Sequence, residues 1–110
     1  MRRPQPDAGD RLAQALRAHC AARGIRMEIE MRTSQAWTSV TFSGARHRLR
    51  LCVEDQVSGA AIDGLLAGLA EAQLDLRGHI LVDLAVSSNA RDESGAPVRV
   101  EIEALTVEAG

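Results

Sequence analysis

The sequence contains no lysine and no tyrosine, and it has only one tryptophan and one phenylalanine. All 13 of its basic residues are therefore arginines. Because alanine is also abundant, we interpret the missing lysine first as the composition bias of a bacterial genome, and only second as a choice of arginine for phosphate or carboxylate recognition. The shortage of aromatic side chains means that Leu, Ile, Val and Met must supply most of the buried apolar surface.

Motifs for chemistry are also lacking. The two cysteines, Cys20 and Cys52, show no zinc-finger or redox spacing, so we expect two reduced thiols and no metal ion. There is no phosphate-binding loop and no GxSxG nucleophile motif. We therefore predict no cofactor and no catalytic residue, and we favour a protein that is not an enzyme.

Targeting signals are missing as well. The basic start Met1–Pro4 is not followed by the apolar stretch of a secretory signal, and no run is long enough to cross a bilayer. We expect a cytoplasmic protein that does not bind membranes. The net charge of -2 provides no global field that would attract nucleic acid.

The length of 110 residues predicts a single domain. Residues 1–6 carry two prolines and no apolar pattern, so we expect a flexible tail there and one folded domain over residues 7–108. A composition of 45% hydrophobic and 25% charged residues is typical of a soluble globular chain.

Residues 25–53 show the period-two alternation of half-buried strands. The first run has apolar residues on one phase, namely Ile25, Met27, Ile29 and Met31. We interpret Thr33–Gln35 as a polar break. A second run then places Val40 and Phe42 inward and Trp37 outward.

A third strand follows a predicted tight turn at Ser43–Ala45. Its inner phase is His47, Leu49, Leu51 and Val53, and its outer phase is Arg46, Arg48, Arg50 and Cys52. The two breaks are too short for parallel crossovers, so these three runs predict an antiparallel meander.

Two helices flank the meander. Asp7 or Asp10 can cap the first, which ends at Gly24 and has an apolar stripe made of Leu12, Ala15, Leu16, His19 and Cys20. The second is expected from a Ser58 cap to about Ala72, with Ile62, Leu65, Leu66 and Leu69 on its apolar face. Its Gly64 and Gly68 indicate close packing against a neighbour, for which we expect the first helix.

Two further strands complete the chain. Residues 79–88 have the inner phase Ile80, Val82, Leu84 and Val86. The last strand points Val98, Val100 and Ile102 inward, and we expect a bulge near Ala104 because Leu105 and Val107 break the phase. The fold prediction is an α+β two-layer sandwich in the order α-β-β-β-α-β-β, with a five-stranded, mainly antiparallel sheet and two helices on one face.

Three functional hypotheses follow. The leading one is a protein-interaction domain, expected to be a homodimer, that uses the outer sheet face through Trp37, Arg46, Arg48, Arg50, Glu28 and Glu30. For the arginines we favour, over phosphate binding, a charge ladder with Glu28 and Glu30 or with Glu101 and Glu103, either within the chain or between subunits. For Trp37 three roles remain open: it is an interface anchor, its ring lies across the arginine side chains, or it is a core residue.

The first alternative is nucleic-acid or other polyanion binding through the arginine row. The second is a small-molecule or enzymatic site between the helices and the sheet, near His47 or His79.

Overall fold

A computed structural model describes residues 7–53, 59–71, 74, 76–91 and 98–108. The predicted tail and the predicted Ser58 cap lie outside these residues. The elements follow in the order α1 (Ala8–Ala21), β1 (Met27–Thr38), β2 (Ser43–Val53), α2 (Gly59–Glu71), β3 (His79–Arg91) and β4 (Val98–Glu108). The chain is thus α+β, built from two successive helix-hairpin units.

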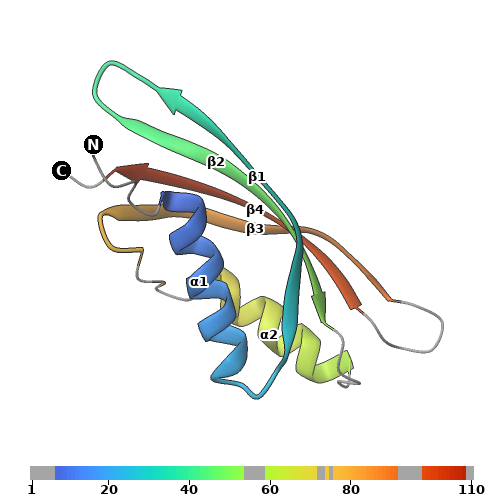
Figure 1. The fold of residues 1–110 in the computed structure, drawn as a ribbon. Coiled ribbons are helices and arrows are strands. Elements are labelled where there is room, and N and C mark those ends of the chain that lie inside the picture. Colours follow the sequence, from blue (N-terminus) through green and yellow to red (C-terminus); the bar gives the residue numbers. More distant parts are fainter. Residues whose placement is uncertain (1–6, 54–58, 72–73, 75, 92–97, 109–110) are drawn as a thin grey trace, which may run out of the picture.

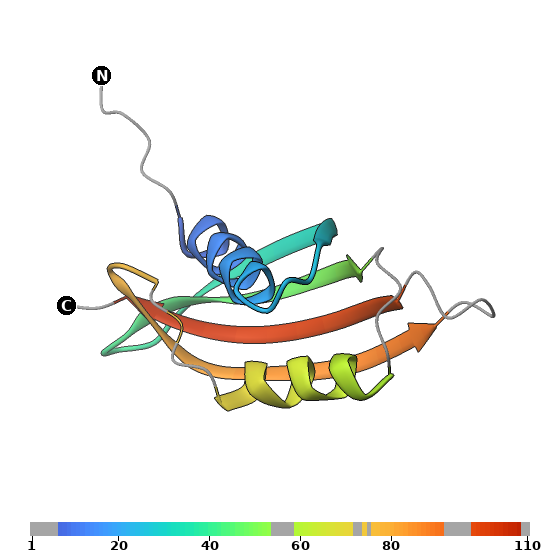
Figure 2. The same cartoon turned by 90° about the horizontal axis from the view of Figure 1, so that it is seen from below.

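The four strands form one antiparallel sheet in the order β1-β2-β4-β3. Figures 1 and 2 show that both helices lie on the same face, α1 beside the β1 end of the sheet and α2 beside β3. Because β2 and β4 are neighbours and run antiparallel, the two units are related by an approximate two-fold axis between them. Three residue pairs with equal spacing along the chain mark this relation: Leu12 and Leu65, Leu16 and Leu69, and Leu49 and Ile102.

Helix α1 begins at the predicted cap. The Asp7 carboxylate accepts a hydrogen bond from the Asp10 amide (2.8 Å), and the Asp10 carboxylate accepts one from the Asp7 amide (3.3 Å), which completes a capping box. The predicted stripe is confirmed for Leu12, Leu16 and Cys20, all buried. Gly24 follows the helix with a φ of +68°, the left-handed conformation that glycine adopts at least cost.

The core lies between the helices and the inner faces of β2 and β4. The inner-phase residues along the middle of these two strands are buried: His47, Leu49, Leu51 and Val53 on β2, and Val98, Val100, Ile102, Ala104 and Thr106 on β4. Leu65 and Leu69 of α2 complete the cluster, as predicted; the side chain of Ile62 lies outside the described part of the chain. The inner phase predicted for 47–53 and 98–102 is therefore confirmed.

The predicted three-strand meander over residues 25–53 is wrong. Thr33–Gln35 is not a break but lies within β1, and the predicted turn Ser43–Ala45 lies within β2. The chain reverses instead at residues 39–42, where the Phe42 carbonyl accepts from the Ser39 amide (2.7 Å). Val40 and Phe42, predicted inward, are therefore exposed by 103% and 57%. The sheet accordingly has four strands rather than five.

A β-bulge explains the error. The pairing of β1 with β2 shifts by one residue between Ile29 and Met31, and an added residue reverses which face every later side chain occupies. Met31, predicted inward, lies opposite Arg50 on the outer phase. Since the bulge leaves the strand continuous, the loss of alternation resembles a break in the sequence.

Strand β3 also has a β-bulge, near its start. A register shift between Leu81 and Asp83 leaves Leu84 and Val86 inward as predicted, but Ile80 and Val82 are exposed by 54% and 53%. By contrast, β4 has no bulge near Ala104 in its pairing with β2. Leu105 and Val107 lie on the outer face instead.

Close packing of a neighbour against Gly64 and Gly68 of α2 was predicted, and the structure shows it at one of the two. The Cβ position of Gly68 lies 3.7 Å from Arg23 and 3.8 Å from His19, both at the end of α1, whereas nothing lies within 4 Å of the Cβ position of Gly64. Close packing is confirmed at Gly68 and wrong at Gly64.

Gly44 is required by the pairing of β2 with β4. An added Cβ would overlap the Thr106 carbonyl and would lie 3.0 Å from Cζ2 of Trp37. We expect Gly44→Ala to lower the free energy of unfolding by roughly 1–3 kcal/mol, since the carbonyl belongs to a fixed backbone. Urea denaturation measures this.

The matched control is Gly64→Ala. It lies inside an exposed helical turn with free space around the Cβ position, so it should raise stability by up to about 1 kcal/mol. Equal stabilities for Gly44→Ala and wild type would contradict the steric argument.

Candidate functional site

The outer face of the sheet is the face that neither helix covers (Figure 2). The pairing registers arrange its side chains in rows that cross the strands in the order β1, β2, β4, β3. The first row is Trp37, Gly44, Val107 and Ile80; the second is Gln35, Arg46, Leu105 and Asp83; the third is Thr33, Arg48, Glu103 and Ala85.

Two of the predicted arginines are engaged within the chain. Arg48 forms an ion pair with Glu103 (3.1 Å), and Arg50 forms one with Glu101 (2.8 Å). The predicted ladder to the last strand is thus present. Arg50 uses both Nε and a terminal nitrogen on the same Glu101 oxygen. These side chains are 34–62% exposed, so each pair stabilises the fold by at most about 1 kcal/mol.

The acids of β1 take different roles. Glu30 accepts from Nε of Arg99 on β4 at 3.0 Å, an ion pair that the sequence prediction missed because Arg99 was not assigned a partner. Glu28 is exposed and lies opposite Cys52 in the register. Neither acid pairs with the arginine row among the described residues.

Arg46 differs from the other two arginines. It is exposed, and within the described part of the chain no acceptor binds its guanidinium group. Asp83 is also exposed and has no ion-pair partner there. The two lie in the same row, on either side of Leu105, and both line a depression of about 540 Å³ that extends over all four strands.

Trp37, whose phase the sequence left open, lies on the outer phase directly opposite Gly44. The absence of a side chain at Gly44 makes room for the indole ring, which is consequently half-buried although no helix covers it. Its N–H is buried and finds no acceptor among the described residues. Ile80 and Val107 extend the row into an apolar strip at this end of the sheet.

A second polar group lies on the inner face, beneath the start of α1. His47 is 3% exposed; its Nδ1 is 2.7 Å from Oγ of Ser34 on β1, and its Nε2 is 2.9 Å from Oγ1 of Thr106 on β4. Ser34 shares this face only because the β1 bulge changed its phase. The alternation of residues 47–53 predicts His47 inward, but neither hydroxyl partner could be predicted from it, since both depend on strand register.

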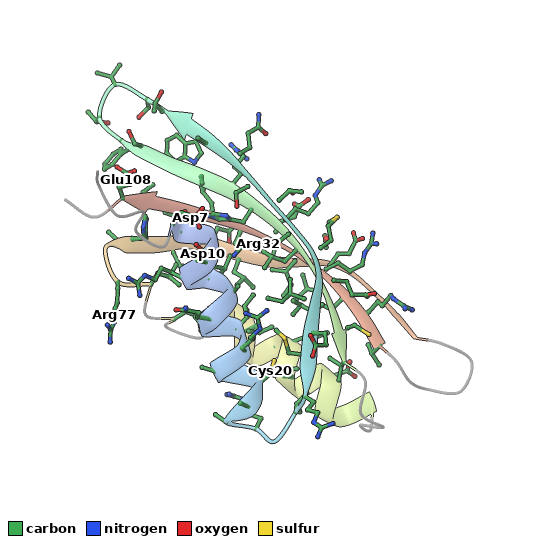
Figure 3. All side chains as sticks on the ribbon, viewed as in Figure 1. Asp7, Asp10, Cys20, Arg32, Arg77 and Glu108 are labelled. Atoms are coloured by element: carbon green, nitrogen blue, oxygen red, sulfur yellow. The ribbon has the colours of Figure 1, made fainter. Side chains whose placement is uncertain are left out.

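The charges around His47 come from three elements. Burial lowers the pKa of His47, Asp7 raises it, and His79 and Arg32 lower it. Figure 3 shows Asp7 and Asp10 at the start of α1 with Arg32 beside them. Arg32 binds Asp10 at 2.8 Å, and this contact holds the pKa of Asp10 below its usual range.

The other candidate groups are dispersed. His19 lies near the end of α1, where burial lowers its pKa, and burial raises the pKa of Cys20. No three His, Cys, Asp or Glu side chains among the described residues gather as a metal site would require. No disulfide joins Cys20 and Cys52. Of the helices described, none has the length and apolar character needed to cross a membrane.

Comparisons with protein-family models, with curated proteins and with solved structures find no match. The geometry of the two sites is therefore the basis for assigning a function.

The lowered pKa of His47 and of His19 makes stability depend on pH. In the unfolded chain both imidazoles take up a proton near pH 6.5, whereas the folded protein resists protonation to lower pH. The stability they contribute is complete above that value and is lost as the pH falls through the folded pKa values. We expect the free energy of unfolding to decrease between about pH 7.5 and pH 5.5.

Two-dimensional NMR of the imidazole protons measures the two titrations directly. Both should have midpoints below the value of about 6.5 found for the same histidines in urea. A midpoint for His47 at or above the urea value would show that burial does not disfavour its charged form.

Proposed function

We propose that this protein is a homodimer that associates through the outer face of its sheet. The observation that carries the proposal is the arrangement of Arg46 and Asp83, opposite charges that flank Leu105 in one row and lack partners among the described residues. A surface that binds a copy of itself across a two-fold axis needs complementary groups on both sides of that axis.

The row meets this requirement in one orientation. Consider an axis that runs parallel to the strands, above β4, in the plane of the interface. Rotation about this axis brings β2 of one protomer over β3 of its partner. Arg46 then faces the partner's Asp83 twice, and Leu105 faces its own copy.

The next row supports the same orientation. Under the rotation Val107 meets its own copy, and the exposed Ile80 meets Gly44 beside the Trp37 ring. The ring of Trp37 borders this contact. Burial of such apolar groups supplies the association energy, and the charge pairs supply orientation.

The intrachain ion pairs argue against the polyanion alternative. Arg48 and Arg50 are each neutralised by a glutamate, which leaves Arg46 as the unpaired member of the predicted row. One exposed guanidinium group is a weak basis for phosphate binding, which normally uses several cations at once.

For the location of the dimer we propose the bacterial cytoplasm, on the basis of the amino-acid composition of the sequence.

A charge exchange tests the dimer. Arg46→Asp or Asp83→Arg alone should weaken association at least about tenfold, because each places like charges face to face. The double variant Arg46→Asp with Asp83→Arg restores the opposite pairing and should recover most of the loss. Size-exclusion chromatography with light scattering over a concentration series gives the dissociation constants.

The matched control is Arg17→Asp on α1, which changes the net charge equally but lies on the opposite side of the sheet. It should leave association unchanged. A wild-type monomer at about 100 μM, or a double variant that associates no better than the single ones, would reject this interface.

A further inference from the structure

The contact of Thr106 with Ala45 favours one tautomer of His47 and with it one direction for its hydrogen bonds. Oγ1 of Thr106 donates to the Ala45 carbonyl (3.4 Å) and therefore accepts from Nε2–H of His47 (2.9 Å). With its proton on Nε2, the neutral imidazole presents a lone pair at Nδ1. The Ser34 hydroxyl, 2.7 Å away, must then be the donor. This is the arrangement of a serine hydroxyl beside its general base.

Ser34, unlike the buried His47, is exposed and lies on the edge strand β1. Its hydroxyl lies 3.0 Å from the Cβ position of Gly9, in the first turn of α1. Gly9 is buried, and the absence of a side chain there lets the first turn of α1 lie directly against this hydroxyl. The capping box engages the amides of Asp7 and Asp10, and those of Ala8 and Gly9 have no acceptor within the described residues. Amides in the first turn of a helix can stabilise a developing oxyanion.

We propose that Ser34 is a nucleophilic serine, with His47 as its general base, that accepts an acyl group from an activated ester. Oγ of Ser34 forms the new bond to the acyl carbon while Nδ1 of His47 takes the hydroxyl proton. The bond from the acyl carbon to the alcohol oxygen breaks, and the imidazolium returns the proton to that leaving alkoxide. Water releases the acyl group by the same two proton transfers.

The surroundings keep His47 in the form that this step needs. Asp7 at the cap of α1 favours the imidazolium, whereas burial, His79 and Arg32 disfavour it, and the net result is a lowered pKa. The Arg32–Asp10 ion pair next to the site neutralises the charge of both groups. His47 is therefore neutral at pH 7 and able to accept the proton.

The test uses p-nitrophenyl acetate as the acyl donor, with nitrophenol release followed by absorbance and the modified residue identified by peptide mass spectrometry. Wild type should acquire one acetyl group on Ser34. Ser34→Ala should not be acetylated within this peptide, and His47→Gln should react at least about tenfold more slowly. Ser39→Ala, in the exposed hairpin loop, is the matched control and should behave as wild type.

The pH profile of wild type keeps the test decisive if His47→Gln fails to fold. The acetylation rate of Ser34 should increase with deprotonation of a group whose pKa lies below 6.5 and should level off above it. A rate that continues to rise in proportion to hydroxide, or acetylation spread over other serines with none on Ser34, would overturn the proposal. Neither outcome depends on whether the protein dimerises, so this test is independent of the proposed interface.

Discussion

The antiparallel pairing of β2 with β4, centred on Leu49 and Ile102, governs the rest of this structure. On the two central strands the inner residues from His47 to Val53 and from Val98 to Thr106 are buried. One face of the sheet must therefore be covered, and α1 and α2 each present a leucine stripe that can cover it. Because the two helix-hairpin units are related by an approximate two-fold axis, each helix covers the half of the sheet that its own strands extend (Figure 1).

The edge strands pair on one side only and therefore tolerate β-bulges, and the bulge in β1 produces both candidate sites. A single bulge between Ile29 and Met31 moves Trp37 to the outer face and Ser34 to the inner face. Without it, the indole would point at the helices and the serine hydroxyl would lie away from His47. Bulges are tolerated at edges because only one neighbouring strand has to adjust. The local irregularity of β1 thus determines the composition of both faces.

The two candidate sites differ in how their polar groups are satisfied. On the outer face, surface ion pairs neutralise Arg48, Arg50 and Arg99, whereas Arg46 and Asp83 form no ion pair with any residue that the structure describes. On the inner face, His47 is fully bonded by two hydroxyl groups, as a buried imidazole must be. The first arrangement suits association and the second suits proton transfer. They lie on opposite phases of the same strands and do not compete for residues.

The elements whose pattern is local could be predicted from the residues alone. The stripe of α1, the buried phases of β2 and β4, the outward arginines and the inward His47 all follow from periods of 3.6 or 2 residues. The number of strands, the phase of Trp37 and Ser34, and the partners of His47 depend instead on the tertiary structure. A bulge changes the phase without changing the kinds of residue that follow it. Likewise, the residues opposite a given side chain depend on strand order, which is set by contacts between segments far apart in the chain.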